Sequence, residues 1–124
     1  MIKNLLLVGL GGSIGSMLRY AAGLLINSKY FPYATLAVNF IGSFIIGIVF
    51  AMSVKEEVLS THWKLFLATG ICGGFTTFSA FSLENMELLQ NGKIGMAAIY
   101  IILSIVLGIV AAFFGFYVSR EWGP

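Results

Sequence analysis

The third long apolar segment of this chain contains an unusual run, Gly70-Ile71-Cys72-Gly73-Gly74-Phe75-Thr76-Thr77-Phe78-Ser79-Ala80-Phe81-Ser82. Three glycines fall within its first five residues, and four hydroxyl side chains fall within its last seven. A helix that crosses a bilayer must satisfy its own backbone groups, and this composition makes a continuous helix difficult to maintain. Non-helical backbone at membrane depth occurs where it is buried in protein or lines a polar cavity. The run therefore predicts a helix break that forms a buried site for an ion or a small substrate.

Composition places the whole chain in the membrane. Of its 124 residues, 59% are hydrophobic and only 10% are charged, and the mean hydropathy is +0.97. A soluble domain has about half apolar and about a quarter charged residues. The net charge of +2 is too small and too dispersed for a nucleic-acid partner. The single cysteine, Cys72, excludes an intrachain disulfide and a cysteine-only metal site, and we interpret it as a small packing residue.

Four apolar segments are long enough to cross a bilayer, which takes about 20 residues. They cover residues 4–26, 33–54, 63–89 and 94–119. The connections 27–32, 55–62 and 90–93 are short, so neighbouring helices are antiparallel and no room remains for an extramembrane domain. We expect an all-α integral membrane fold, a single domain over residues 1–124 with four transmembrane helices, of which the third is broken.

Small residues recur at a spacing of four, which lets helix backbones approach closely. They are Gly11 with Gly15, Ser43 with Gly47, and Ser104 with Gly108 and Ala112. The pattern over residues 9–15 is G-x-G-x-x-x-G, which differs from a dinucleotide-binding fingerprint and lacks its βαβ context. We therefore interpret it as a packing face.

The distribution of cations sets the orientation of a membrane protein. One side holds Lys3, Lys55, Lys64 and Arg120, and the other holds Lys29 and Lys93, with Arg19 directed toward it. This bias is so weak that two alternatives stay open, a fixed topology and insertion in both orientations. Insertion in both orientations would permit an antiparallel dimer. A partner chain is also expected because one four-helix unit can hardly shield a polar path from lipid.

Two polar residues lie deep in the first two segments. Arg19 either forms an electropositive entrance for anions or extends toward the interface near Ile26. Asn39 either donates in a permeation path or forms interhelical hydrogen bonds.

The third segment offers donors to an anion. Its hydroxyls are those of Thr76, Thr77, Ser79 and Ser82. Phe78 and Phe81 are three residues apart and share a helical face beyond the break. Ring edges are electropositive, so these groups would solvate a small anion without a full positive charge. The alternative is that both rings are ordinary core residues.

The remaining polar groups allow two further readings. Tyr100 and Ser104 share a face of the fourth segment and would extend the line of hydroxyls. Glu84 and Glu87 belong either to a polar pathway or to a solvated helix end, and the solvated end suits Glu87 better. Carbonyls freed by the break would coordinate a hard cation such as Na⁺.

Three motifs together resemble the Fluc (CrcB) family of fluoride channels. They are Gly73-Gly74-Phe75-Thr76-Thr77-Phe78-Ser79-Ala80-Phe81-Ser82 in the third segment, Val38-Asn39-Phe40-Ile41-Gly42 in the second and Gly15-Ser16-Met17-Leu18-Arg19-Tyr20 in the first. The resemblance covers the whole chain. It implies a non-enzymatic, multi-pass protein of the bacterial inner membrane, an antiparallel dual-topology homodimer whose two pores passively export fluoride from the cytoplasm.

The resemblance also implies roles for individual residues. A structural Na⁺ would be held at the dimer centre by the backbone carbonyls of Gly73 and Thr76 from both subunits. The remaining matches are the paired pore phenylalanines Phe78 and Phe81, the pore asparagine Asn39, the vestibule arginine Arg19, the polar pore positions Tyr100 and Ser104, and the acidic residue Glu84. Ala80 departs from the family, whose members often carry threonine there.

Two other classes of membrane protein compete with this interpretation. A small proton-coupled exporter of cationic drugs would need a carboxylate in the first helix, where this chain has Arg19 instead. A structural membrane subunit would not explain polar residues clustered around a helix break. A hydrolase is excluded because no Ser/His/Asp set or metal cluster is available.

Overall fold

The computed structural model describes residues 1–26, 31–54 and 60–122. Their elements are α1 (Ile2–Leu25), α2 (Tyr33–Val54), α3 (Thr61–Lys64), the π-helical η1 (Leu65–Cys72), α4 (Gly73–Phe75), α5 (Phe78–Gln90) and α6 (Ile94–Trp122). Four stretches are long and apolar enough to cross a membrane, namely Ile2–Leu25, Tyr33–Ser53, Thr61–Gln90 and Ile94–Arg120. The predicted all-α, multi-pass membrane fold is confirmed. Lys29 and Lys55, used above for orientation, lie outside the described residues.

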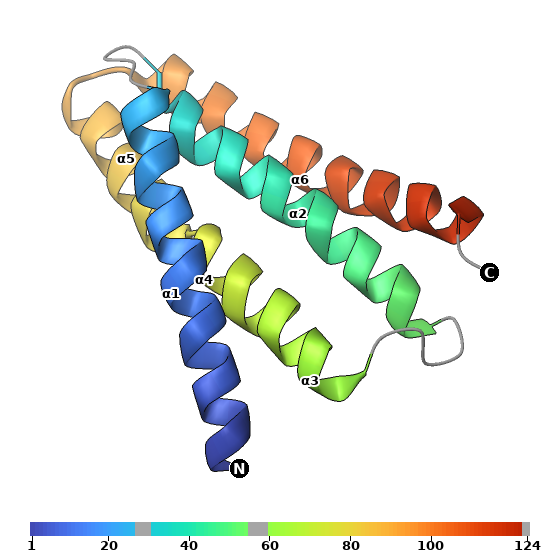
Figure 1. Ribbon diagram of the computed structural model, residues 1–124. Coiled ribbons are helices and arrows are strands. Elements are labelled where there is room, and N and C mark those ends of the chain that lie inside the picture. The colour runs from blue at the N-terminus through green and yellow to red at the C-terminus, as the bar shows by residue number, and fades with distance from the viewer. Residues whose placement is uncertain (27–30, 55–59, 123–124) are drawn as a thin grey trace.

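The third span is broken, as predicted, and the break lies at two threonines (Figure 1). Thr76 (φ −84°, ψ 157°) and Thr77 (φ −153°, ψ 127°) have extended backbones between α4 and α5. The Thr77 hydroxyl then caps α5 by accepting a hydrogen bond from the N–H of Ala80 at 3.1 Å. Gly73, by contrast, is helical (φ −63°, ψ −35°). The hydroxyl half of the run therefore makes the break, and its glycines do not.

The glycines instead let α1 cross η1 and α4 in direct backbone contact. We call Gly11, Gly12, Gly15, Gly70 and Gly74 the glycine seam. A Cβ atom added to Gly70 would lie 2.9 Å from the Cα of Gly11, and one added to Gly74 would lie 2.5 Å from the carbonyl oxygen of Gly12. The predicted packing face of the first segment is confirmed, and its partner is the glycine-rich half of the run in the third span.

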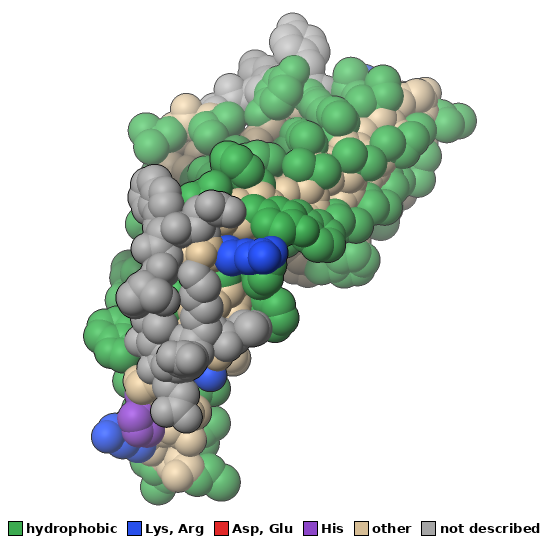
Figure 2. Space-filling view, turned by 90° about the vertical axis from the view of Figure 1, so that its right-hand side faces the viewer, with side chains coloured by type: hydrophobic (Ala, Val, Ile, Leu, Met, Phe, Trp, Pro, Cys, Tyr) green, Lys and Arg blue, Asp and Glu red, His purple; other side chains and the backbone are tan. Residues whose placement is uncertain are grey.

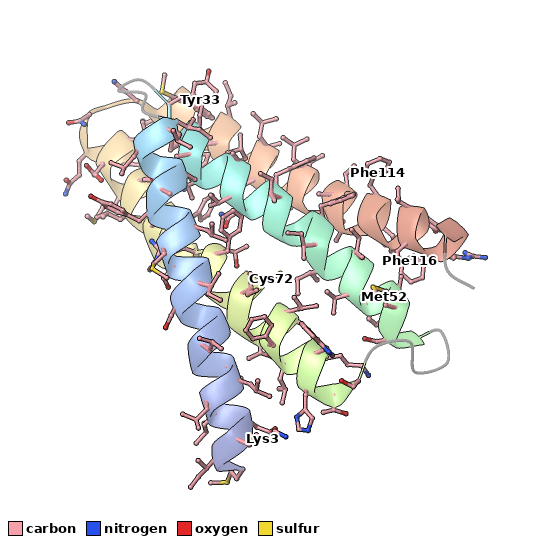
Figure 3. The ribbon with its side chains drawn as sticks, in the orientation of Figure 1. Lys3, Tyr33, Met52, Cys72, Phe114 and Phe116 are labelled. Atoms are coloured by element: carbon pink, nitrogen blue, oxygen red, sulfur yellow. The ribbon has the colours of Figure 1, made fainter. Side chains whose placement is uncertain are left out.

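A second helix pair, α2 and α6, runs side by side along its length (Figure 1). A Cβ atom on Gly47 would collide with the backbone of Ala112, so the predicted spacing of small residues forms this contact. Aromatic pairs extend the contact, with ring centroids of Phe44 and Phe114 5.5 Å apart; Figure 3 shows Phe114 and Phe116 on α6. Hydrophobic side chains gather over the upper right part of the face seen in Figure 2, as expected for a surface in contact with lipid.

A tight turn joins α5 to α6 and brings the two helices together. Gly92 has a positive φ of 76°, which glycine adopts without steric cost. The N–H of Gly92 donates to the carbonyl of Leu89 at 3.1 Å, and the N–H of Lys93 donates to the carbonyl of Leu88 at 2.8 Å. These bonds satisfy the end of α5 and place its polar face beside Tyr100 of α6.

We expect Gly15→Ala to destabilise the fold, because a Cβ atom there would collide with the carbonyl oxygen of Ile71 and lie 2.8 Å from the backbone nitrogen of Phe75. The cost of such overpacking is about 1–3 kcal/mol. Gly23→Ala is the matched control in the same helix, since no atom of the residues that the structure describes lies within 4 Å of its Cβ position. Thermal unfolding in detergent should show a lower Tm for Gly15→Ala alone; equal values for the two variants would contradict the seam.

Candidate functional site

Asn39 of α2 holds the break open. Its side-chain Oδ1 accepts a hydrogen bond from the backbone N–H of Thr77 at 3.0 Å, and its Nδ2 donates to the Thr77 carbonyl at 3.4 Å. One amide therefore satisfies both backbone groups of a residue that is outside any helix. The predicted interhelical hydrogen bonds are present, and they go to the broken backbone.

These bonds free two carbonyl oxygens. In a continuous helix the N–H of Thr77 would donate to Gly73, and the N–H of Ala80 would donate to Thr76. Here the first N–H donates to Asn39 and the second to the Thr77 hydroxyl. The carbonyls of Gly73 and Thr76 thus lose their helical donors. They are the two that the family resemblance assigns to a cation, and oxygen ligands suit a hard cation.

Arg19 satisfies a third carbonyl at the same place. Its Nε donates to the carbonyl of Gly74 at 3.2 Å, replacing the helical donor Phe78, which begins α5. The glycine seam fixes the distance between α1 and α4 and so brings this arginine to the break. Arg19 is half-buried, and its side chain faces protein.

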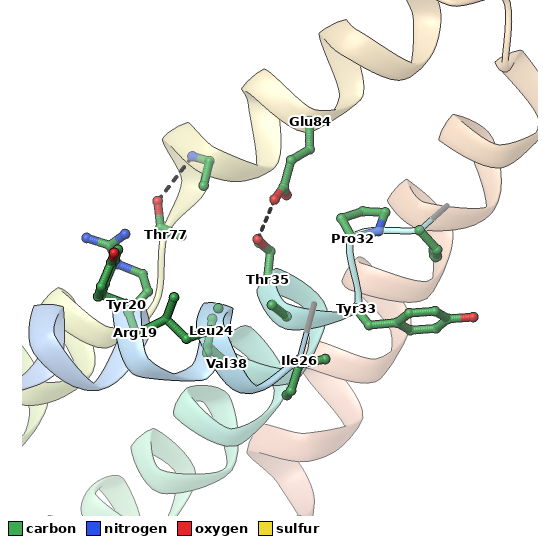
Figure 4. Close-up of a pocket in the computed structure, with 14 residues that line it drawn as sticks. Arg19, Tyr20, Leu24, Ile26, Pro32, Tyr33, Thr35, Val38, Thr77 and Glu84 are labelled. Atoms are coloured by element: carbon green, nitrogen blue, oxygen red, sulfur yellow. Dashed lines mark hydrogen bonds between the residues drawn. The ribbon is translucent and has the colours of Figure 1, made fainter. Parts of the chain in front are cut away.

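A cavity of about 430 Å³ lies beside Arg19, between α1, α2 and α5 (Figure 4). Its polar lining comes from Arg19, Thr35, Thr77 and Glu84. The Glu84 carboxylate accepts hydrogen bonds from the Thr35 hydroxyl at 2.7 Å and from the Tyr100 hydroxyl at 2.8 Å. The carboxylate is therefore held in place, and the Arg19 guanidinium lines the same cavity. We call this space the vestibule.

A second cavity of about 310 Å³ lies on the other side of the break. Its described lining consists of Asn39, Ser43, Thr76, Thr77, Phe78, Phe81, Ser104, Ile105 and Gly108. The rings of Phe78 and Phe81 lie 5.7 Å apart between centroids, and Phe78 is 78% exposed. Thr77 lines both this cavity and the vestibule. We call this second space the inner cavity.

The structure brings most of the predicted residues to these two cavities and places four elsewhere, one of which is Gly73. Tyr100 is fully buried, donates to Glu84, and packs against Phe81 in a tilted arrangement with ring centroids 5.0 Å apart. Ser79 is exposed and its hydroxyl lies 3.2 Å from that of Thr77. Ser82 is exposed and is not among the described lining residues of either cavity.

Sequence reasoning missed two lining residues, Thr35 and Ser43. The signal is present in the sequence, since both are four residues from Asn39 and so share its face of α2. Thr35, Asn39 and Ser43 therefore form a polar stripe along one face of α2. This stripe reaches from the vestibule to the inner cavity.

Comparison with known proteins identifies the family to which this chain belongs. Residues 6–116 match the family model described as "CrcB-like protein, Camphor Resistance (CrcB)". The chain belongs to the CrcB family. A CrcB relative from Flavobacterium psychrophilum is 46% identical over 124 residues, which cover 97% of this chain and 99% of the relative. One from Thermus thermophilus is 47% identical over 118 residues, which cover 93% of this chain and 94% of the relative.

Both CrcB relatives carry the name "Fluoride-specific ion channel FluC". The match of the CrcB model spans the described residues of both cavities, from Arg19 in α1 to Gly108 in α6. The family predicted from the three motifs is therefore confirmed.

Proposed function

We propose that this protein is a fluoride channel that passively exports fluoride from the cytoplasm. The observation that carries the proposal is that Thr77 lines two polar cavities in a protein whose relatives are named fluoride-specific ion channels. On this proposal the vestibule collects the anion and the inner cavity passes it on. The Thr77 peptide, held by Asn39, separates the two spaces.

The electrostatics of the two cavities suit an anion. The Arg19 guanidinium attracts anions to its side of the vestibule, while the Glu84 carboxylate that lines the same cavity accepts hydrogen bonds from Thr35 and Tyr100. The inner cavity has phenyl rings and hydroxyls, and the described residues that line it carry no charged side chain. Ring edges and hydroxyl donors solvate an anion without a full charge, so the anion binds weakly enough to leave again.

The functional unit on this proposal is an antiparallel homodimer with two pores. Two features of the single subunit support a protein partner. The Phe78 ring, part of the inner cavity, is 78% exposed, and Gly73, whose carbonyl lacks its helical donor, is exposed as well. Unsatisfied carbonyls are costly in lipid, so a second subunit is a better neighbour than the bilayer.

A central structural Na⁺ belongs to the same proposal. The freed carbonyls of Gly73 and Thr76 give two oxygen ligands per subunit, and the Na⁺ would offset their lost hydrogen bonds. We expect exchange of Na⁺ for N-methyl-D-glucamine to reduce the dimer fraction in detergent. The fraction is measured by size exclusion with light scattering. A dimer equally stable in both salts would count against the cation.

The channel is tested by reconstituting the purified protein into liposomes loaded with potassium fluoride. After a potassium ionophore is added, a fluoride electrode should record rapid efflux without a pH gradient, while chloride-loaded liposomes release little. Efflux that requires a proton gradient would favour the proton-coupled exporter. A folded protein with no efflux would favour a structural subunit.

A further inference from the structure

Most polar side chains around the inner cavity are already engaged. The Asn39 amide bonds to the backbone of Thr77. The Thr76 hydroxyl donates to the carbonyl of Cys72 at 2.8 Å, and the Thr77 hydroxyl is held by Ser79 and the N–H of Ala80. These groups shape the cavity, and the donors that they leave unused are the second N–H of Asn39 and one hydroxyl hydrogen of the Thr77–Ser79 pair.

Two hydroxyls in the same cavity differ from all of these. The Ser104 Oγ is buried and has no hydrogen-bond partner, and no partner is present for the Ser43 hydroxyl among the residues that the structure describes. Serines within helices commonly donate to the carbonyl four residues back, as Ser53 does to Val49 at 2.8 Å and Ser13 does to Gly9 at 2.8 Å. An unpaired hydroxyl in an apolar environment is unfavourable, so the buried Ser104 hydroxyl needs a partner from outside the chain, and the Ser43 hydroxyl lines the same cavity.

The helix pair places the two hydroxyls at one site. Ser43 lies on α2 and Ser104 on α6, which pack side by side, and both line the inner cavity. One turn beyond Ser104, a Cβ atom added to Gly108 would lie 3.7 Å from the Ser43 Oγ, which is van der Waals contact. The Ser43 side chain therefore reaches over Gly108 toward α6.

We infer that Ser43 completes, with Ser104, a hydroxyl pair that donates two hydrogen bonds to a small anion in the inner cavity. The inference rests on the proposed function and adds Ser43 to the residues that bind the ion. An anion suits the site better than a cation because the edges of Phe78 and Phe81, which line the same cavity, are electropositive. Since the pair carries no charge, it binds the anion weakly enough for the anion to leave again.

The test compares Ser43→Ala, Ser104→Ala and the double variant with Ser53→Ala. Ser53 is the matched control because it lies on the same helix and its hydroxyl is already bonded to a carbonyl. Loss of one hydrogen bond to an ion should raise the half-saturating fluoride concentration about tenfold in each single variant. If both hydroxyls hold one ion, the double variant should shift by less than the product of the two single shifts.

A second readout measures binding without transport. Fluoride should raise the Tm of the wild-type protein in detergent, and each serine-to-alanine variant at the pair should lose most of that rise while keeping the Tm found without fluoride. Wild-type half-saturation in Ser43→Ala would overturn the inference and leave the channel intact. A wild-type protein that shows the Tm rise but conducts no fluoride would refute the channel, while loss of the rise in both variants would still support the pair.

Discussion

Replacing Asn39 with alanine should reduce fluoride flux to background and lower the free energy of unfolding by about 3 kcal/mol. The variant loses both hydrogen bonds to Thr77, and each buried backbone group left unpaired costs about 1–3 kcal/mol. Without Asn39, the N–H of Thr77 can still donate a helical hydrogen bond to the carbonyl of Gly73, four residues back. We expect the chain to close the break in that way, which would move Thr77 away from both cavities and disrupt the path that they form.

Asn39→Asp distinguishes the effect of losing the hydrogen bonds to Thr77 from the effect of a negative charge beside the path. A protonated carboxyl can donate to the Thr77 carbonyl and accept from its N–H, as the amide does. An ionised carboxylate loses the donor and places a negative charge beside the anion path. Flux should therefore be low at neutral pH and recover as the pH is lowered, whereas Asn39→Ala stays inactive at every pH.

The control for both variants is Asn91→Ala, because Asn91 is exposed at the end of α5, away from both cavities. Flux is measured in liposomes with a fluoride electrode across a range of pH, with folding checked by size exclusion. Asn39→Asp that conducts fully at neutral pH with its carboxyl ionised would remove Asn39 from the path.

Phe81→Ile should leave the fold and the assembly nearly intact and reduce fluoride flux about tenfold or more. Isoleucine keeps most of the apolar volume against Tyr100, whose ring lies 5.0 Å from that of Phe81, so the core should tolerate the change. What disappears is the phenyl ring at the inner cavity, and only an aromatic ring has an electropositive edge that could solvate an anion there.

Phe113→Ile is the matched control for this change. Phe113 is 57% exposed on α6 and is absent from the described lining of the inner cavity. Liposome flux and the Tm of both variants should be measured together. If Phe81→Ile folds normally and conducts like the wild type, the ring is a core residue, which is the alternative that the sequence left open.

The broken third span could be predicted from sequence because lipid admits few exceptions to the continuous helix. The position of the break could not be predicted. Glycine has low helix propensity, which draws attention to residues 70–74, yet those glycines are helical, and α1 contacts the backbone of Gly70 and Gly74. The break lies instead where Thr77 can cap α5 and Asn39 can satisfy its backbone. Asn39 is 38 residues away from Thr77 in the sequence, so the helix propensity of the residues around the break cannot predict this interaction.

The residues of the candidate site could also be predicted only in part. Residue types identified Arg19, Asn39, Phe81 and Ser104 as polar or aromatic lining, and the structure places all four at a cavity. Side-chain direction was not accessible in this way. Tyr100 looked like a pore hydroxyl, but its hydroxyl is committed to Glu84, a pairing between α5 and α6 that depends on the turn at Gly92.

The glycine seam has a mechanical consequence. Many membrane transporters change state by sliding or rocking one helix group against another. Here α1 and the first half of the third span meet backbone to backbone at Gly11 and Gly70, with no side-chain layer that could deform to let them slip. Since Arg19 on α1 also donates a hydrogen bond to the Gly74 carbonyl, we expect α1 and the break to move together. We therefore expect any opening or closing of this path to come from small rotations of side chains. This suits a channel that stays open better than a transporter that alternates between two states.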